Sequence, residues 1–164
     1  MGLIFLRHPV PDVPAGVCYG ATDIGLAPGW EARVDALDVR AGAVRHSPLL
    51  RCRAPAERLA ARLGVPAIAD PDLREMDFGL WEMRRWDAIP RAELDAWAAD
   101  VAGYRPPGGE TVREMAARGA RALDRAEDGD LILSHAGIWK ALRHRAGDPA
   151  GWEARIGYLE PVLV

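Results

Sequence analysis

Two short apolar segments, one near each end of the chain, lead into a histidine. Residues 3–6 (LIFL) are followed by Arg7 and His8, and residues 131–133 (LIL) are followed by Ser134 and His135. A short apolar run that ends at polar residues is typical of a buried parallel strand. In open α/β sheets, ligands bind beyond the carboxyl ends of such strands. Two imidazoles delivered there by different strands can face each other across one pocket, an arrangement that indicates phosphoryl chemistry.

The two histidines suit different parts of that chemistry. A neutral imidazole is a good nucleophile near pH 7 when its other nitrogen donates a hydrogen bond, so His8 is the candidate nucleophile. His135 precedes a predicted helix whose first backbone N–H groups, beginning at Ala136, attract an anion. Either histidine alone could be a surface residue at a strand end. Their predicted position at one edge of the same sheet favours the functional interpretation.

Arg51 and Glu75 are the further candidates. Lys140 is the only lysine among 21 basic residues, so an arginine next to a histidine carries no information by itself. Arg51 lies in the first turn of a predicted helix that follows a strand, and its guanidinium can bind phosphate oxygens in a bidentate fork. Arg53 is expected on a solvated face. Glu75 could protonate a leaving alkoxide, and its alternative is an ordinary surface charge.

The elements that must position these residues alternate along the chain. Strands are predicted at 3–7, 43–46, 66–69, 130–134 and 158–164. Helices are predicted at 30–40, 47–63, 91–101, 111–126 and 137–145. The alternation predicts a three-layer α/β/α sandwich with a mostly parallel central sheet and an edge strand, in a single domain over residues 1–164.

Local signals set several of these boundaries. Ser47 and Pro48 are predicted as the N-cap and first residue of their helix. Pro55 is expected to kink or restart the same helix. Thr111 and Glu114 form a capping-box pattern, worth about 1 kcal/mol. Pro161 is expected to confine the last strand to a sheet edge. Residues 72–89 are predicted as a loop packed over the domain.

Composition narrows the range of partners. The chain has 164 residues, 49% of them hydrophobic, and a formal net charge of −3, which gives no sign of a nucleic-acid or membrane partner. Cys18 and Cys52 are too few for a disulfide framework, and the first apolar run is too short for a signal peptide or membrane span. A cytoplasmic protein is expected. The oligomeric state stays open, with a homodimer as one option.

Five short motifs, in order, resemble those of the histidine phosphatase superfamily, which includes the cofactor-dependent phosphoglycerate mutases. They are LRH at 6–8, SPLLR at 47–51, LREMDFGLWE at 73–82, PGGET at 107–111 and SHAG at 134–137. Together they are far more specific than any one alone. The resemblance implies a phosphoglycerate mutase-like fold.

The resemblance also implies roles. His8 would attack phosphorus and form a covalent phosphohistidine, while Arg7, Arg51 and a protonated His135 would hold the phosphoryl oxygens. Glu75 would protonate the leaving group and then activate water. No metal or other cofactor is needed in this scheme, and the sequence has no cluster with metal-ligand spacing.

Within the superfamily, residues 16–23 (GVCYGATD) resemble the short α-ribazole phosphatases, which act on a precursor of the cobalamin lower ligand. The alternative is that this stretch is only a glycine-rich connection. Thr22 is the candidate in it for an additional phosphate contact. Pro9 departs from the family, because it stands where glycine is usual and lacks the N–H that could face phosphate. Met83 also replaces a common glycine.

Three functions stay open. The first is a phosphomonoesterase that acts on a small phosphorylated metabolite through phospho-His8. The second is a mutase, which needs loops that keep the phosphohistidine from water. The chain contains no insertion suited to that task, so hydrolysis is favoured. The third is a phosphoryl-binding module without turnover, against which the presence of Glu75 argues.

Overall fold

A computed structural model describes residues 2–164, and within them five strands form one sheet. The strands are β1 (Ile4–Arg7), β2 (Val44–His46), β3 (Ala67–Ala69), β4 (Leu131–Ser134) and β5 (Pro161–Leu163). Their order is β3-β2-β4-β1-β5. The first four are parallel, and β5 pairs antiparallel with β1 at the edge. The predicted mostly parallel sheet is confirmed, and Pro161 does lie in the edge strand.

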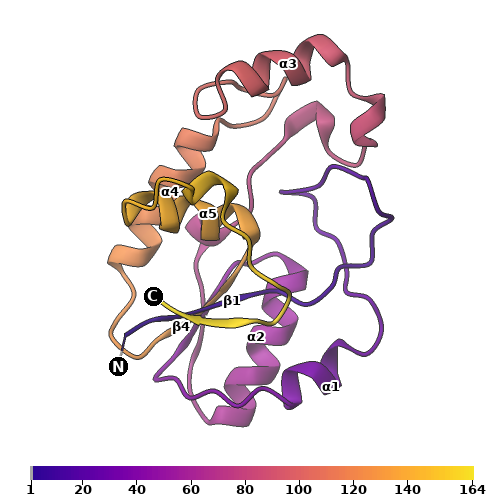
Figure 1. Ribbon diagram of the computed structural model, residues 1–164. Coiled ribbons are helices and arrows are strands. Elements are labelled where there is room, and N and C mark those ends of the chain that lie inside the picture. Colours follow the sequence, from indigo (N-terminus) through magenta and orange to yellow (C-terminus); the bar gives the residue numbers. More distant parts are fainter. Residues whose placement is uncertain (1) are drawn as a thin grey trace.

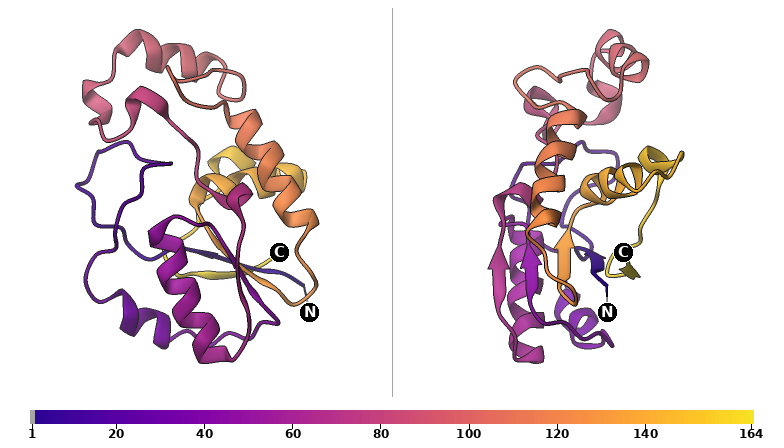
Figure 2. Two further views of the ribbon diagram at one scale, coloured as in Figure 1. Left: turned by 180° about the vertical axis from the view of Figure 1, so that it is seen from behind. Right: turned by 90° about the vertical axis from the view of Figure 1, so that its left-hand side faces the viewer.

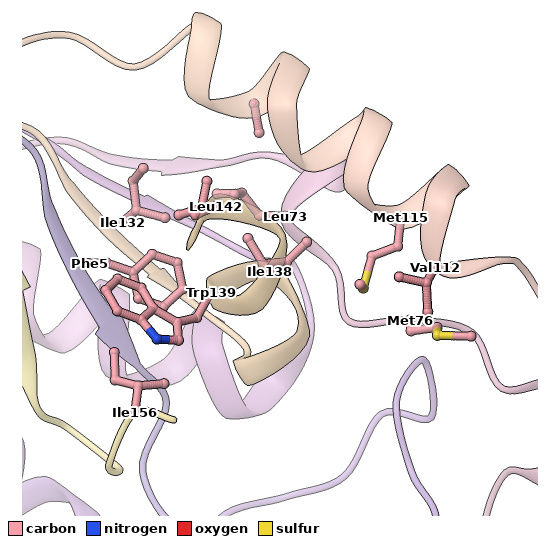
Figure 3. Packing of buried hydrophobic residues seen from close by; sticks show 11 residues of the cluster. Phe5, Leu73, Met76, Val112, Met115, Ile132, Ile138, Trp139, Leu142 and Ile156 are labelled. Carbon is pink, nitrogen blue, oxygen red and sulfur yellow. The ribbon is translucent and has the colours of Figure 1, made fainter. Parts of the chain in front are cut away.

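Helices cover both faces of this sheet, which confirms the predicted sandwich (Figures 1 and 2). They are α1 (Trp30–Asp35), α2 (Leu50–Leu63), α3 (Arg91–Ala99), α4 (Val112–Asp124) and α5 (Ala136–Arg145). Successive side chains of a strand point to opposite faces. Phe5 and Ile132 therefore pack with residues of α4 and α5 (Figure 3), whereas Leu6 and Leu133 pack with residues of α2.

A cap lies at the far end of the molecule from β5, around α3 (Figure 1). We use the word for residues 78–105. The predicted loop over 72–89 contains two short 3-10 turns, at Gly79–Trp81 and Trp86–Ala88, and a third, at Pro71–Leu73, overlaps its start. The cap has its own apolar cluster, centred on the buried residues Cys18, Trp81 and Ile89. Cys18 belongs to an N-terminal loop, and its backbone bonds to Met83 and Arg84 tie that loop to the cap.

The first predicted helix is too long. α1 ends at Asp35 instead of residue 40. After it, Leu37, Val39 and Ala41 all pack against the apolar cluster on the α2 face of the sheet. Their spacing of two is that of an extended chain, so burial of alternate residues overrides the helical pattern.

The start of α2 also differs from its prediction. The helix begins at Leu50, and the Ser47 hydroxyl accepts a hydrogen bond from the Leu49 N–H in the turn before it. Pro55 does not restart the helix, which runs unbroken to Leu63. Proline removes one backbone bond there, while buried residues before and after it, Cys52 and Leu59, hold both parts against the sheet.

The capping box at the start of α4 is confirmed. The Thr111 hydroxyl accepts from the Glu114 N–H at 3.1 Å, and the Glu114 carboxylate accepts from the Thr111 N–H at 2.9 Å. Helices α3 and α4 end two residues before their predicted ends, within the usual uncertainty of helix boundaries. Among the helices of residues 2–164, none has the length and apolar character to cross a bilayer.

Candidate active site

The register of two neighbouring strands brings the two histidines together. In the parallel pair β1 and β4, the last residues Arg7 and Ser134 lie opposite each other. His8 and His135 directly follow these two strand ends. The His8 N–H extends this ladder by donating to the Ser134 carbonyl at 3.0 Å. The imidazole centroids lie 5.3 Å apart, with the rings edge to face.

One hydrogen bond sets the proton position on His8. Its Nδ1 lies 2.6 Å from the carbonyl oxygen of Pro9. A carbonyl can only accept, so Nδ1 carries the proton and Nε2 has a free lone pair. Burial, followed by the charge of Arg51, lowers the pKa of His8 to about 3, although the bond to Pro9 opposes this. The imidazole is therefore neutral at pH 7, as a nucleophile must be.

His135 directly precedes α5 and is fully buried. Its Nε2 lies 2.8 Å from the Ser47 hydroxyl oxygen and 3.4 Å from the Cys52 sulfur. Burial, then the charge of Arg51, lowers its pKa well below the usual value. The His135 imidazole is therefore neutral in the free protein, and its expected protonation against a bound phosphoryl group stays a prediction.

Two arginines beside the histidines have incomplete hydrogen bonding. Arg7 donates to the Ile156 carbonyl at 3.1 Å, and its guanidinium lies 3.9 Å above the Tyr158 ring. Arg51 is fully buried and donates to the carbonyls of Gly20 and Thr22, at 2.5 and 2.9 Å. In both arginines Nε is buried and makes no hydrogen bond within residues 2–164. A buried N–H group without a hydrogen-bond partner costs free energy. A ligand whose oxygens accept from these two Nε–H groups would therefore bind favourably here.

Glu75 comes to the same edge of the sheet from the segment after β3. Its carboxylate accepts from the backbone N–H groups of Met76 at 2.9 Å and Gly137 at 3.0 Å. A Cβ on residue 137 would collide with this carboxylate, so glycine in the first turn of α5 lets the acid approach. The carboxylate is thus fixed next to the helix start that follows His135.

A cavity of about 550 Å³ opens over these groups. Of the residues predicted for the site, Arg7, His8, Glu75 and Ala136 line it. Arg51 and His135 are fully buried and are not among the residues that line it.

Thr22 is not among the residues that line this cavity. Its hydroxyl donates to Glu82 at 2.7 Å, and its carbonyl accepts from Arg51. A direct phosphate contact by Thr22 stays a prediction.

Three residues near the site are not among the candidates taken from the sequence, although Glu82 ends the motif at 73–82. Tyr158 lies under Arg7 and 5.7 Å from His8, measured between ring centroids. Glu82 accepts from the backbone N–H groups of Gly20 and Thr22 and so orders the loop that contacts Arg51. Arg118 of α4 binds the backbone next to Glu75. Among so many arginines, only the helix register of Arg118 could have singled it out.

Metal-ligating side chains are not gathered at this site. Across residues 2–164, no three His, Cys, Asp or Glu side chains are grouped so as to hold a metal ion. His46, at the end of β2, bonds through Nδ1 to the backbone carbonyl of Ser47. The positive charge next to His8 comes from Arg51 and Arg7.

Known proteins resemble this chain in sequence and fold. The chain is 39% identical over 98 residues to the probable phosphoglycerate mutase GpmB of Erwinia tasmaniensis, which covers 54% of this chain and 45% of that protein. TTHB049 from Thermus thermophilus superimposes with a TM-score of 0.78 at 27% identity, covering all of this chain and 92% of that one. The α-ribazole phosphatase from Shigella flexneri has the same fold, with a TM-score of 0.84 at 24% identity over all of this chain and 95% of that one.

The matched lengths show the family of this chain but not the activity of its longer relatives. The chain spans between 36% and 57% of the length of the curated relatives that it matches. The family model for the histidine phosphatase superfamily (branch 1), however, matches residues 3–156, almost the whole chain. With the two histidines, two arginines and the glutamate of the motifs at one sheet edge, the chain belongs to the histidine phosphatase superfamily.

Proposed function

We propose that this protein is a metal-independent phosphomonoesterase that acts through a phosphohistidine at His8. The observation that carries the proposal is the state of His8: a buried, neutral imidazole whose Nδ1 proton is held by Pro9, so that Nε2 is free to attack. The unpartnered Nε groups of Arg7 and Arg51 support it, because phosphoryl oxygens would supply the missing acceptors.

The reaction follows in two balanced steps. His8 Nε2 forms a bond to phosphorus as the ester P–O bond breaks, and a proton held on Glu75 passes to the departing alkoxide oxygen. The Glu75 carboxylate then takes a proton from water as that water attacks phosphorus. The P–N bond breaks, and inorganic phosphate and neutral His8 are released. Arg7 and Arg51 offset the negative charge on the equatorial oxygens in both steps.

A first test measures hydrolysis of p-nitrophenyl phosphate in the presence of EDTA. We expect activity from the wild type, loss of at least about a thousand-fold in His8→Ala, and an acid-labile phosphoprotein trapped in the wild type alone. Arg53→Ala is the control, because the Arg53 side chain is 46% exposed and lies outside the cavity. Full activity in a folded His8→Ala protein would overturn the mechanism.

For a physiological substrate we propose α-ribazole 5′-phosphate, which would place the protein in cobalamin biosynthesis in the cytoplasm. The resemblance of residues 16–23 to α-ribazole phosphatases supports this substrate. A ring-bearing alcohol also fits a cavity that Phe78, Trp86 and Trp97 line in part. Release of phosphate from α-ribazole 5′-phosphate at a higher kcat/KM than from ribose 5-phosphate is the expected result.

A mutase is the second candidate, because the GpmB relatives are described as probable phosphoglycerate mutases. Incubation with 3-phosphoglycerate distinguishes the two functions. A phosphatase releases inorganic phosphate, whereas a mutase forms 2-phosphoglycerate with little release. We expect neither product in quantity, because the apolar cavity has few groups that could bind the carboxylate of this acid.

A further inference from the structure

Each of the two arginines next to His8 lies against the ring of a tyrosine. The guanidinium carbon of Arg7 is 3.9 Å from the centroid of the Tyr158 ring, and that of Arg51 is 5.3 Å from the centroid of the Tyr19 ring. Both distances fall within the range of about 6 Å over which an aromatic face attracts a cation. Both tyrosines are also close to the reacting groups, since Tyr19 lines the cavity and the Tyr158 ring lies 5.7 Å from that of His8.

Neither guanidinium has a carboxylate partner within residues 2–164. The hydrogen bonds that they donate go to backbone carbonyls, that of Ile156 for Arg7 and those of Gly20 and Thr22 for Arg51. A carboxylate would cancel the positive charge and would occupy N–H groups along the guanidinium edge. An aromatic ring contacts the flat face of the guanidinium and leaves the edge free.

The segment that carries Tyr158 contacts Arg7 in three ways. Besides the Ile156 carbonyl and the Tyr158 ring, the Leu159 N–H donates to the Arg7 carbonyl at 2.9 Å. Leu159 has a φ of 53°, in the left-handed region that is unfavourable for residues other than glycine. Its side chain is buried in the apolar cluster on the α2 face of the sheet. Strained backbone persists only where its surroundings hold it, and this strained residue directly follows the ring under Arg7.

Tyr19 adds no negative charge to the site. Burial, followed by the neighbouring Tyr158, raises the pKa of Tyr19 to about 12, although Arg7 and Arg51 oppose this. A phenolate beside the two guanidinium groups would cancel part of the positive charge that attracts a phosphoryl dianion. The neutral phenol leaves that charge intact near pH 7.

We propose that Tyr158 and Tyr19 are positioning residues, whose ring faces hold Arg7 and Arg51 so that the N–H edges of both guanidinium groups stay free for phosphoryl oxygens. This role rests on the proposed function, because it takes both arginines as ligands of the phosphoryl group. The tyrosines act through the arginines, and the ring acts rather than the phenol hydroxyl. Phenylalanine should therefore replace either tyrosine, and leucine should replace neither.

Titration calorimetry with orthophosphate tests the role of the rings. Tyr158→Leu is expected to raise the Kd at least about five-fold, the loss of one cation–π contact, and Tyr158→Phe to keep it within about two-fold. Tyr19→Leu and Tyr19→Phe should give the same order with a smaller change, because Arg51 lies farther from its ring. If Tyr158→Leu does not fold, Tyr19→Leu decides, because Tyr19 lies in a loop and is only half-buried.

Tyr104→Leu is the matched control. Tyr104 is the third tyrosine of the chain; it stacks on Trp81 in the cap and does not line the cavity. This variant should bind orthophosphate as the wild type does. Wild-type affinity in the folded leucine variants of Tyr158 and Tyr19 would overturn the proposal. So would phenylalanine variants as weak as the leucine variants, because the hydroxyl would then be the group that acts.

A double-mutant cycle shows whether Tyr158 acts through Arg7. The kcat/KM for p-nitrophenyl phosphate is measured in Tyr158→Leu, in Arg7→Met and in the variant that combines them. We expect Tyr158→Leu to lower kcat/KM at least about five-fold alone but less than about two-fold in the Arg7→Met background, where the ring has no guanidinium to hold. Equal losses in the two backgrounds would show a general structural role and refute the assignment.

The binding and rate measurements together separate this role from the proposed phosphomonoesterase. If the Kd for orthophosphate depends on the rings as expected but the wild type hydrolyses no ester, the phosphomonoesterase fails and the positioning role stands. If the wild type hydrolyses the ester and the leucine variants bind and react as it does, the positioning role fails and the phosphomonoesterase stands. A wild type that neither binds orthophosphate nor hydrolyses the ester overturns both.

Discussion

Two neutral imidazoles lie side by side next to two guanidinium groups, and their neutrality follows from where the chain places them. His8 is 2% exposed and His135 is fully buried, so a proton on either ring would lose most of its hydration. Arg51 adds unfavourable charge to both protonated forms. A bound phosphoryl dianion would offset the two guanidinium charges and so favour a proton on His135 when substrate binds.

The low pKa of His8 predicts how stability depends on pH. In the unfolded chain the imidazole takes up a proton below about pH 6.5, whereas in the folded protein it does so only near pH 3. This contribution to stability is therefore present above pH 6.5 and is lost as the pH falls. Between pH 7.5 and 5 the loss from His8 amounts to about 2 kcal/mol.

Urea denaturation at the two pH values measures this effect. We expect the free energy of unfolding to fall between pH 7.5 and 5 in the wild type, and to fall by about 2 kcal/mol less in His8→Ala. The same pH dependence in His8→Ala and the wild type would show that His8 is not held neutral by burial.

Among the helices, α4 has a direct part in placing the acid. Arg118 donates from Nη1 to the Asp72 carbonyl at 2.9 Å and from Nη2 to the Glu75 carbonyl at 2.9 Å, and it also contacts the Arg74 carbonyl. Its ion pair with Glu110 is 2.5 Å long. Glu110 in turn accepts from the Asp77 N–H at 3.0 Å. One nearly buried pair thus fixes the backbone on both sides of Glu75.

Arg118→Met should therefore impair proton donation by Glu75 as well as stability. We expect a loss of about 3 kcal/mol in the free energy of unfolding, because Glu110 loses its partner. The kcat should fall more for an alkyl phosphate than for p-nitrophenyl phosphate, whose phenolate leaves without a proton. Arg121→Met is the control on the same helix, with its side chain 59% exposed. Equal losses of kcat on both substrates would show that Arg118 has only a general structural role.

Whether an element can be predicted from the sequence depends on whether its own residues or contacts with distant residues determine its position. Strands β1 and β4 were predictable because a buried parallel strand is a continuous apolar run, and their ends place His8 and His135. The turn before α2 was harder, since Ser47 bonds to His135 and does not cap the helix. Tyr158 could not be predicted as part of the site, because its position depends on how the segment before β5 packs under Arg7.

The molecule as a whole joins separate pieces of chain at the phosphoryl site. β1, the turn from β4 into α5, the start of α2 and the segment with Glu75 all converge at the carboxyl edge of the sheet. The loop of residues 16–22 connects this edge to the cap, since Cys18 bonds to the cap and the carbonyls of Gly20 and Thr22 accept from Arg51. An anion that bridges Arg7 and Arg51 would link these pieces and so stabilise the entire fold.

Thermal unfolding with added orthophosphate tests that link. At ten times its Kd, an anion that binds only the folded protein adds about 1.4 kcal/mol, or roughly 3–5 °C in Tm for a domain of this size. We expect this rise in the wild type and its loss in Arg51→Met, whatever the starting Tm of the variant. Arg53→Met, two residues further along α2 and with its side chain 46% exposed, should keep the full rise. Sodium chloride at the same ionic strength excludes a general salt effect. A rise of the same size in Arg51→Met would mean that phosphate binds elsewhere, and the two buried Nε groups would then need a different acceptor.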